Sequence, residues 1–200
     1  MCIRDRTSTT ITQLVDTAGK LSQNRRGALI VVDLGSDLRP EDFLYSGTTI
    51  EAQLSTDLLI NLFATDTPLH DGAVLVKGNK IISAGVILPL SRQGISRYGT
   101  RHLAALGITE RFDRCICIVV SEETGTLSLA SQGKLERPIT SSRLQELLVD
   151  LIGNQNSIAT GKSSSNKTSL SQETKTGDNI ISGINEKESN RTENFTHQKD

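Results

Sequence analysis

Residues 72–90 read GAVLVKGNKIISAGVILPL, and this stretch predicts how the chain folds. Two apolar runs, 73–76 and 81–88, flank the turn Lys-Gly-Asn-Lys, and a Gly-Asn pair between such runs is typical of a β-hairpin. A hairpin supplies an antiparallel pair of strands. The sheet that contains residues 72–90 is therefore predicted to have antiparallel pairs, whatever other strands join it.

Before this hairpin, two helical segments and one strand are predicted. Apolar side chains at helical spacing predict an amphipathic helix over residues 10–24, which Gly27 follows as a C-terminal glycine. The apolar run 28–32 predicts a buried strand. Residues 38–47 are predicted to form a loop or a short helix, and the next helix has Ser55 as its N-cap.

After the hairpin, the same alternation continues. The sequence predicts a helix with Thr100 as N-cap, a buried strand over 115–120, a further hairpin, and a last helix capped by Thr140 or Ser141. Hairpins provide antiparallel pairs and the helices cover the sheet. The predicted fold class is therefore α/β, with a mixed central β-sheet surrounded by helices.

Composition divides the chain of 200 residues into three parts. Residues 1–9 are expected to be a non-native or disordered leader, since no apolar segment of a signal peptide follows MCIRDR. Residues 10–153 carry the periodic patterns of a folded domain. Residues 154–200 are rich in Ser, Thr, Asn, Lys and Glu without a period, which predicts a disordered polar tail.

Charge and residue usage narrow the function. The net charge is -1 and aromatic residues make up 3%, so nothing indicates a nucleic-acid partner. No apolar run reaches the roughly 18–20 residues that cross a bilayer. Cys115 and Cys117 alternate on one face of a predicted strand and are expected to be buried, reduced thiols, which fits a cytoplasmic location.

Polar residues stand where three predicted elements begin or end. His70 and Asp71 precede the strand that begins at 73, residues 99–102 (GTRH) begin a helix, and residues 121–125 (SEETG) follow a buried strand. Taken singly, each cluster is also typical of a turn, a helix cap or an acidic surface loop. Together they supply an imidazole, carboxylates, an arginine and a helix N-terminus, which suit metal-assisted phosphoryl chemistry.

Five motifs in order resemble one known family. GALIVV, LHDGAVLV, ILPLS, GTRHLAALGITE and IVVSEETG are similar to the diadenylate cyclase (DAC) domain, in particular to its membrane-linked type, over about residues 11–151. The resemblance implies a mixed sheet wrapped by helices. It also implies a nucleotidyltransferase that condenses two ATP molecules into the second messenger cyclic di-AMP and two pyrophosphates, with Mn²⁺, Mg²⁺ or Co²⁺.

The resemblance also implies a role for each site residue. Asp71 would favour deprotonation of the ribose 3′-hydroxyl, with Arg101 and His102 acting on the phosphates as further catalytic residues. His70 and Glu123 would hold the metal ion. The implied ATP-binding residues are Gly72, Ala73, Leu88, Gly99, Thr100 and Ser121, with Leu88 against the adenine.

Assembly follows from the reaction that the resemblance implies. One chain offers one site for one ATP, so two copies are expected to face each other as a homodimer across a two-fold axis. The membrane-linked type carries N-terminal membrane helices. The resemblance therefore implies a truncated chain, tethered at the cytoplasmic face of a membrane through an N-terminal region that these residues lack.

Two positions depart from the family pattern. The family commonly has Arg-His-Arg where this chain has Arg101, His102 and Leu103, and an aromatic residue often stands where this chain has Ile87. Leu103 either removes a phosphate-binding cation or continues an apolar helix face. The alternatives to an active cyclase are a catalytically weakened nucleotide-binding regulatory module of the same fold, and a scaffold whose polar clusters are turns.

Overall fold

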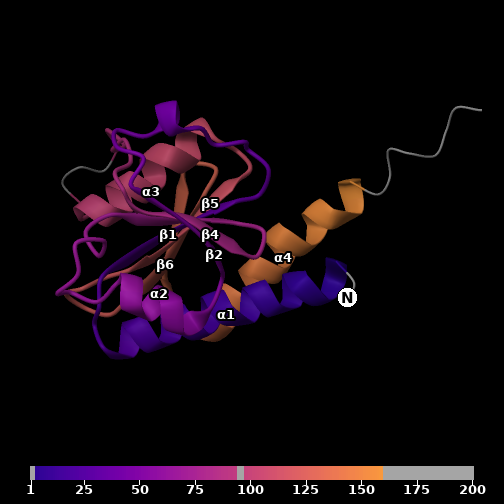
Figure 1. Ribbon diagram of the computed structural model, residues 1–200, viewed down its shortest axis with the longest axis horizontal. Helices are drawn as coiled ribbons and strands as arrows, with labels where there is room; N and C mark the ends of the chain where they lie inside the picture. Colours follow the sequence, from indigo (N-terminus) through magenta and orange to yellow (C-terminus); the bar gives the residue numbers. More distant parts are fainter. Residues whose placement is uncertain (1–2, 94–96, 160–200) are drawn as a thin grey trace, which may run out of the picture. The chain divides into compact units, whose positions relative to one another are not determined.

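A computed structural model describes residues 3–93 and 97–159 (Figure 1). In these residues, seven strands form one sheet in the order β2-β4-β3-β1-β5-β6-β7. The strands are β1 (Ala28–Asp33), β2 (Thr48–Gln53), β3 (Ala73–Lys77), β4 (Lys80–Val86), β5 (Cys115–Val120), β6 (Leu127–Ser131) and β7 (Lys134–Ile139). Only β1 and β3 pair in parallel among these seven, so the predicted mixed sheet is confirmed.

Helices cover both faces of the sheet. Figure 1 shows α3 (Thr100–Arg111) on one side and α1 (Ile3–Gln23), α2 (Thr56–Leu62) and α4 (Ser141–Ala159) on the other. The side chains of β1 alternate between the two cores: Ile30 packs towards α1 and α4, whereas Val31 packs towards α3. This alternation of a fully buried strand explains why residues 28–32 read as one continuous apolar run.

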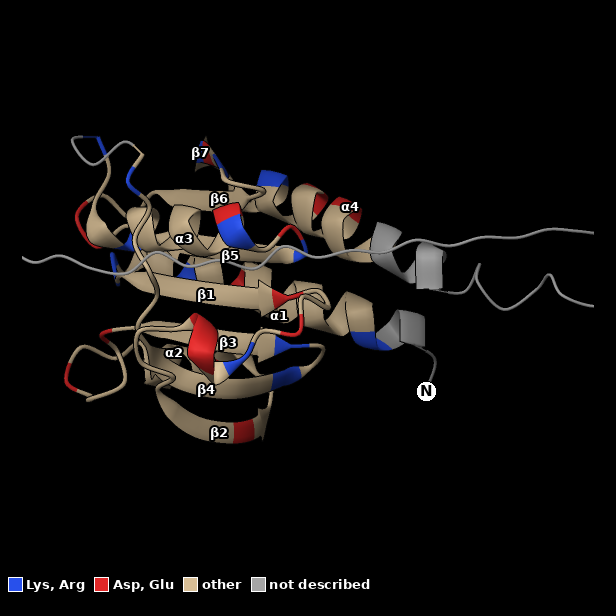
Figure 2. Cartoon of the chain, turned by 90° about the horizontal axis from the view of Figure 1, so that it is seen from above, with Lys and Arg blue, Asp and Glu red and all other residues tan. Residues whose placement is uncertain are grey.

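Charged residues are scarce in the central strands and lie at strand ends, in connecting loops and on helices (Figure 2). All six residues of β1 and all six of β5 are buried, and Asp33 at the end of β1 is the one charged residue among them. In β1 and β5, a charged side chain therefore occurs at a strand end and not on the faces of the sheet.

Several element boundaries differ from the predictions. The helix α1 begins at Ile3 rather than at residue 10, because an established helix gains one hydrogen bond for each added residue without needing further apolar positions. Residues 3–9 are therefore helical, whereas we expected a leader there. The helix α4 continues past residue 153 to Ala159, and residues 160–200 lie outside the described part.

One strand was missed, and one cap was placed a residue late. β2 is an edge strand with mostly exposed side chains and a bulge after Thr49, so it lacks the apolar alternation that predicts a strand. Gly99 is the N-cap of α3 and Thr100 its first residue. The predicted N-cap Ser55 is confirmed, since its hydroxyl accepts a hydrogen bond from the Leu58 amide at 3.2 Å. The predicted loop or short helix is a 3-10 helix, η1 (Pro40–Asp42).

Candidate active site

Strand pairing brings the DGA and SEETG segments to the same end of the sheet, where β3 and β1 begin and β5 ends. Ile30 pairs with Val74 in the parallel ladder, and Ala28 pairs with Val120 in the antiparallel ladder. β3 begins at Ala73 and β5 ends at Val120, and both of these strand ends lie beside the start of β1. β3 and β5 flank β1 on its two sides, with about 4.8 Å between neighbouring strands. Asp71 and Ser121 are therefore neighbours of the same strand end.

The glycine of the DGA segment is required by the fold. A Cβ on Gly72 would lie 2.6 Å from the backbone carbon of Gly85 in β4, closer than side-chain atoms approach. Ala73 is fully buried on the α3 side of the sheet. Small residues here let β3 and β4 pack closely, and Asp71 is left exposed at the mouth of the strand.

His70 is oriented by a hydrogen bond within its own loop. Its Nδ1 lies 2.5 Å from the Thr67 carbonyl oxygen, and because a carbonyl can only accept, Nδ1 carries the proton. With Nδ1 bonded to this carbonyl, Nε2 is the ring nitrogen that is left to ligate a metal ion. The role of the half-buried His70 as a metal ligand stays a prediction.

A cavity of about 380 Å³ lies between the start of α3 and the loop after β5. Six of the predicted site residues line it: Gly99, Thr100, Arg101, His102, Ser121 and Glu123. The remaining lining includes Glu122, Arg97 and Arg137. Two segments that are about 20 residues apart in the sequence thus share one polar cavity. The other predicted site residues do not line it: His70, Asp71, Gly72, Ala73 and Leu88.

Arg101 is held by a partner that the sequence did not indicate. Its Nη1 donates to Glu122 Oε2 at 2.6 Å, and 21% of its side chain is exposed against 60% for Glu122. Gly27, just before β1, lies against this pair: a Cβ there would be 2.8 Å from Glu122 Oε2 and 2.9 Å from the guanidinium. Gly27 was interpreted as the end of a helix, and nothing in its local sequence indicates this second role.

Backbone hydrogen bonds within the loop after β5 stabilise its turn. Ser121 exchanges hydrogen bonds with the two residues that close the turn, accepting from the Gly125 amide at 2.9 Å and donating to the Thr126 carbonyl at 3.0 Å. The Thr124 amide donates to the Ser121 hydroxyl at 3.3 Å. Glu123 sits at the exposed tip of this turn, at the rim of the cavity.

His102 lies deeper than a phosphate-binding role requires. It is 7% exposed, and its Nε2 lies 3.2 Å from Ser128 Oγ in β6. Burial lowers the pKa of the His102 ring, and the positive charge of Arg137 lowers it further. The ring is therefore neutral at neutral pH and is bonded to the interior of the domain.

Two apolar site positions face the core. Leu88, expected beside the adenine, is 3% exposed and packs with residues of α3, whereas its neighbour Ile87 is 41% exposed. Leu103 is 6% exposed, and its carbonyl accepts a hydrogen bond from the Ser91 amide at 2.9 Å. Of the two interpretations of Leu103, the structure favours the apolar helix face.

The two predicted metal ligands lie in different loops, since His70 precedes β3 and Glu123 follows β5, and only Glu123 lines the cavity. Over the described residues, no group of three His, Cys, Asp or Glu side chains is placed to hold a metal ion. A divalent ion would accordingly have at most two such side chains of the described residues as ligands, and phosphate and water oxygens would complete its shell, as is usual for Mg²⁺.

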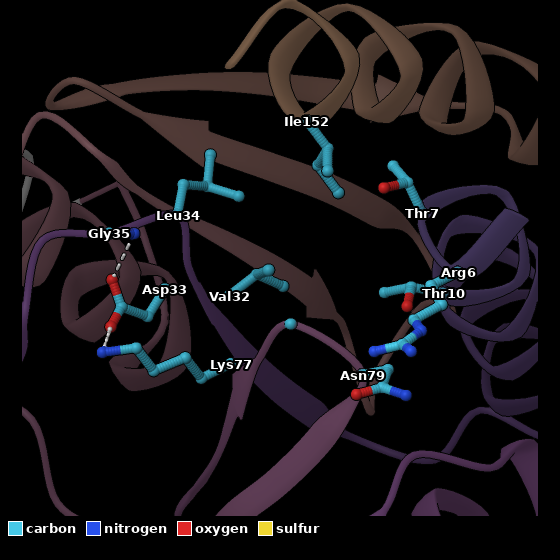
Figure 3. Close-up of a pocket in the computed structure, with 11 residues that line it drawn as sticks. Arg6, Thr7, Thr10, Val32, Asp33, Leu34, Gly35, Lys77, Asn79 and Ile152 are labelled. Carbon is cyan, nitrogen blue, oxygen red and sulfur yellow. Dashed lines mark hydrogen bonds and ion pairs between the residues drawn. The ribbon is translucent and has the colours of Figure 1, made fainter. Parts of the chain in front are cut away.

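A second cavity of about 390 Å³ lies at the opposite edge, near the β3–β4 turn (Figure 3). It combines apolar walls from Val32, Leu34 and Ile152 with polar groups such as Arg6 and Asn79. None of the predicted site residues lines it.

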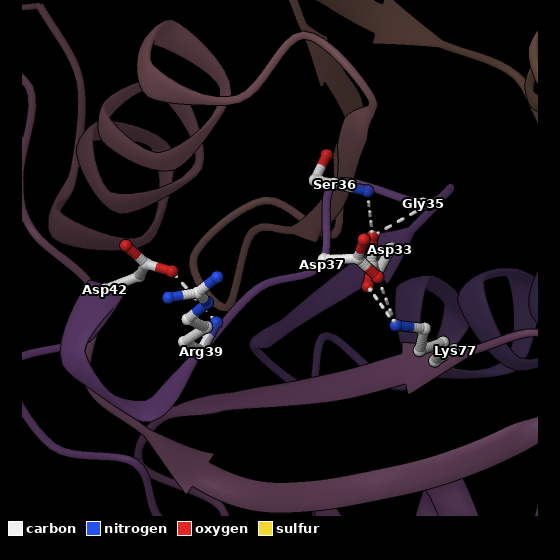
Figure 4. Close-up of polar contacts among 7 residues, drawn as sticks. All are labelled: Asp33, Gly35, Ser36, Asp37, Arg39, Asp42 and Lys77. Atoms are coloured by element: carbon white, nitrogen blue, oxygen red, sulfur yellow. Dashed lines mark hydrogen bonds and ion pairs between the residues drawn. The ribbon is translucent and has the colours of Figure 1, made fainter.

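Beside this cavity, Asp33 ties the end of β1 to β3 (Figure 4). Its carboxylate accepts from the Gly35 and Ser36 amides at 2.9 and 2.7 Å and lies 3.3 Å from Lys77 Nζ. Hydrogen bonds to Asp37 and Asp33 raise the pKa of Lys77.

The buried thiols Cys115 and Cys117 are free, as predicted, and burial raises the pKa of Cys117.

The described helices include none that is both long and apolar enough to cross a membrane.

Comparisons with known proteins point to one family. The family model described as "DisA bacterial checkpoint controller nucleotide-binding" (DAC) matches residues 15–135. A diadenylate cyclase of Listeria monocytogenes serotype 1/2a (strain 10403S) is 47% identical over 131 residues, which cover 64% of this chain and 47% of that protein. A diadenylate cyclase of Mycoplasma genitalium is 35% identical over 145 residues, covering 71% of each chain.

A solved structure agrees with these relatives. The crystal structure of a double mutant of DacA from Staphylococcus aureus matches with a TM-score of 0.66 and 36% identity, covering 72% of this chain and 96% of that one. The chain therefore belongs to the DAC family, and the resemblance seen in its motifs is confirmed. The chain spans about half the length of the Listeria relative.

Proposed function

We propose that this chain is the catalytic part of a diadenylate cyclase, a nucleotidyltransferase that joins two ATP molecules into cyclic di-3′,5′-AMP and releases two pyrophosphates. One observation carries the proposal: Arg101, Thr100, Ser121 and Glu123 line one cavity. Asp71 lies outside that lining, but it precedes β3, which begins at the same end of the sheet. Cations, hydroxyls and a helix N-terminus suit a triphosphate, and a carboxylate beside them suits a hydroxyl nucleophile.

The proposed reaction assigns a role to each group. The 3′-oxygen of one ATP attacks the α-phosphorus of the other, the bond from that phosphorus to the pyrophosphate oxygen breaks, and the hydroxyl proton passes towards Asp71. Thr100, Arg101 and Ser121 bind phosphate oxygens, with Gly99 beginning the helix whose amide groups face them. The ILPLS segment would form the base side of the site, with Leu88 supporting this segment from the core.

A divalent ion, Mn²⁺, Mg²⁺ or Co²⁺, would be held by His70 and Glu123 together with phosphate oxygens. It would neutralise phosphate charge and lower the pKa of the attacking hydroxyl. His102 would hold the first turn of α3 through its contact with Ser128, rather than touch phosphate itself.

A complete reaction needs two copies of the chain. Each copy carries one such edge, so each would bring one ATP, and two edges must face each other across a two-fold axis. The partner of the reaction is thus a second copy of this chain. We further infer that the domain works in the cytoplasm, where ATP is available, at a membrane face if the native chain is tethered.

The regulatory alternative depended on a missing cation at residue 103. Because the Leu103 side chain is buried, no observation of the site favours that alternative.

The test is product identification. The chain is incubated with ATP and Mn²⁺, and the mixture is separated by chromatography and identified by mass spectrometry. We expect cyclic di-AMP with two pyrophosphates for each product, at a rate per chain that rises with protein concentration because two copies must meet. ATP that stays intact at every concentration, although it binds, would instead support a regulatory module.

A further inference from the structure

The cavity between the start of α3 and the loop after β5 is lined by positively charged side chains that lie outside the family motifs. Three guanidinium groups line it among the described residues: Arg97, Arg101 and Arg137. Arg101 is paired with Glu122 at 2.6 Å, so much of its charge is already balanced. Arg137 lies in β7, and no described carboxylate comes within ion-pair distance of it, although its neighbour Glu136 pairs with Arg143.

Arg137 is nevertheless held in place. Its guanidinium carbon lies 5.6 Å from the ring centroid of Tyr98, the distance of a cation–π contact. Tyr98 is half-buried, and its ring centroid is 6.3 Å from that of His102, which is anchored to Ser128. An exposed arginine stacked on a supported ring has a defined position and keeps its donors free for another partner.

Its neighbours favour an anionic partner. Burial and the charge of Arg137 both lower the pKa of His102, so the adjacent imidazole is neutral and the guanidinium supplies the positive charge at this place. Thr100 and Ser121 place hydroxyl groups in the same cavity. An ATP triphosphate carries several negative charges, and Arg101, already paired with Glu122, balances few of them.

We propose that Arg137 is a triphosphate-binding residue of this site and that Tyr98 is its positioning residue. This inference rests on the proposed function, since it takes the occupant of the cavity to be a nucleoside triphosphate. The guanidinium donates to non-bridging phosphate oxygens. Tyr98 keeps it at the cavity instead of in solvent.

Binding measurements test the inference without turnover. The probe is 3′-deoxy-ATP, which lacks the attacking hydroxyl, and its affinity is measured by calorimetry with Mg²⁺ beside that of adenosine. The variant Arg137→Gln loses charged hydrogen bonds to phosphate. Its affinity for 3′-deoxy-ATP should therefore be roughly ten- to hundredfold weaker than that of the parent, and its affinity for adenosine should be unchanged. Arg137→Lys should fall between the parent and Arg137→Gln. Tyr98→Leu should weaken binding by a smaller factor, and Tyr98→Phe should restore it.

The matched control is the variant Arg143→Met. Arg143 is exposed, pairs with Glu136 and Glu146, and lies outside the cavity. Affinity of Arg137→Gln and Arg137→Lys equal to that of this control would overturn the inference, as would a parent chain that does not bind 3′-deoxy-ATP. The proposed function fails separately: if the parent binds 3′-deoxy-ATP through Arg137 but makes no cyclic di-AMP from ATP, the phosphate site stands and the cyclase assignment does not.

Discussion

The guanidinium of Arg101, in the first turn of α3, donates to the carboxylate of Glu122, in the loop after β5, at 2.6 Å. This pair joins the two segments that form the cavity, and Gly27 leaves the space that it occupies. The Arg101 side chain therefore keeps one position at the edge of the sheet where the phosphates are proposed to bind.

Gly27→Ala is expected to disturb this pair without unfolding the domain. The new methyl group would meet the flexible ends of Arg101 and Glu122, which can move aside, so the free energy of unfolding should change by less than about 1 kcal/mol. The displaced guanidinium should lower kcat/KM for ATP about tenfold, as measured by product formation. Gly153→Ala, with no atom within 4 Å of its added carbon, is the control. Equal activity of both variants would show that the position of Arg101 is unimportant.

Leu103→Arg is expected to destabilise the domain. Placing a charge at a position that is 6% exposed should cost about 3 kcal/mol in the free energy of unfolding, measured by urea denaturation. Leu90→Arg, at a position that is 53% exposed, should cost less than about 0.5 kcal/mol. The variant Leu103→Arg would contradict this account if it kept parental stability and turned over ATP faster, because residue 103 would then face the phosphates.

The environment of His102 predicts a pH dependence of stability. Its pKa is lowered in the folded state, so the unfolded chain binds the proton more readily, and the stabilisation is present above the unfolded value of about 6.5. As the pH falls through that value, this contribution is lost. Urea unfolding of the parent at pH 7.5 and pH 5.5 should show the loss, and His102→Gln should reduce the difference. An unchanged difference in His102→Gln would assign the effect to other groups.

Asp33 is predicted to matter for stability and not for catalysis. Asp33→Ala leaves the Gly35 and Ser36 amides without their acceptor and Lys77 without one partner, which should cost about 1–3 kcal/mol in unfolding free energy. Because Asp33 lies at the opposite end of β1 from Gly27, kcat/KM for ATP at a temperature below the transition should stay within twofold of the parent. A large loss of turnover in the folded variant would show that the two edges are coupled.

Local pattern was enough to predict the elements that define the fold class. The hairpin of β3 and β4 and the buried strand β5 were predicted because a Gly-Asn turn and unbroken apolar runs are signals within a few residues. The edge strand β2 was not predicted, since its stability comes from pairing with β4 and its own side chains are mostly exposed.

The site was predicted residue by residue, but its construction was not. The parallel pairing of β1 with β3 and the antiparallel pairing of β1 with β5 together bring the start of β3 and the end of β5 to one edge. Such pairings are non-local, so one sequence does not display them. For the same reason, only the structure shows that Glu122 pairs with Arg101 and that Arg137 of β7 lines the cavity.

We propose that Asp71, exposed just before β3, makes a ribose oxygen nucleophilic, and the proposed mechanism depends on this role. Its most direct test compares the parent with Asp71→Asn, which keeps the size and exposure of the side chain, in ATP with Mn²⁺, by quantifying cyclic di-AMP with mass spectrometry and 3′-deoxy-ATP affinity by calorimetry. We predict that Asp71→Asn binds the analogue within a few fold of the parent and forms at least about a hundredfold less product. Cyclic di-AMP formed by Asp71→Asn at the parental rate would contradict the account.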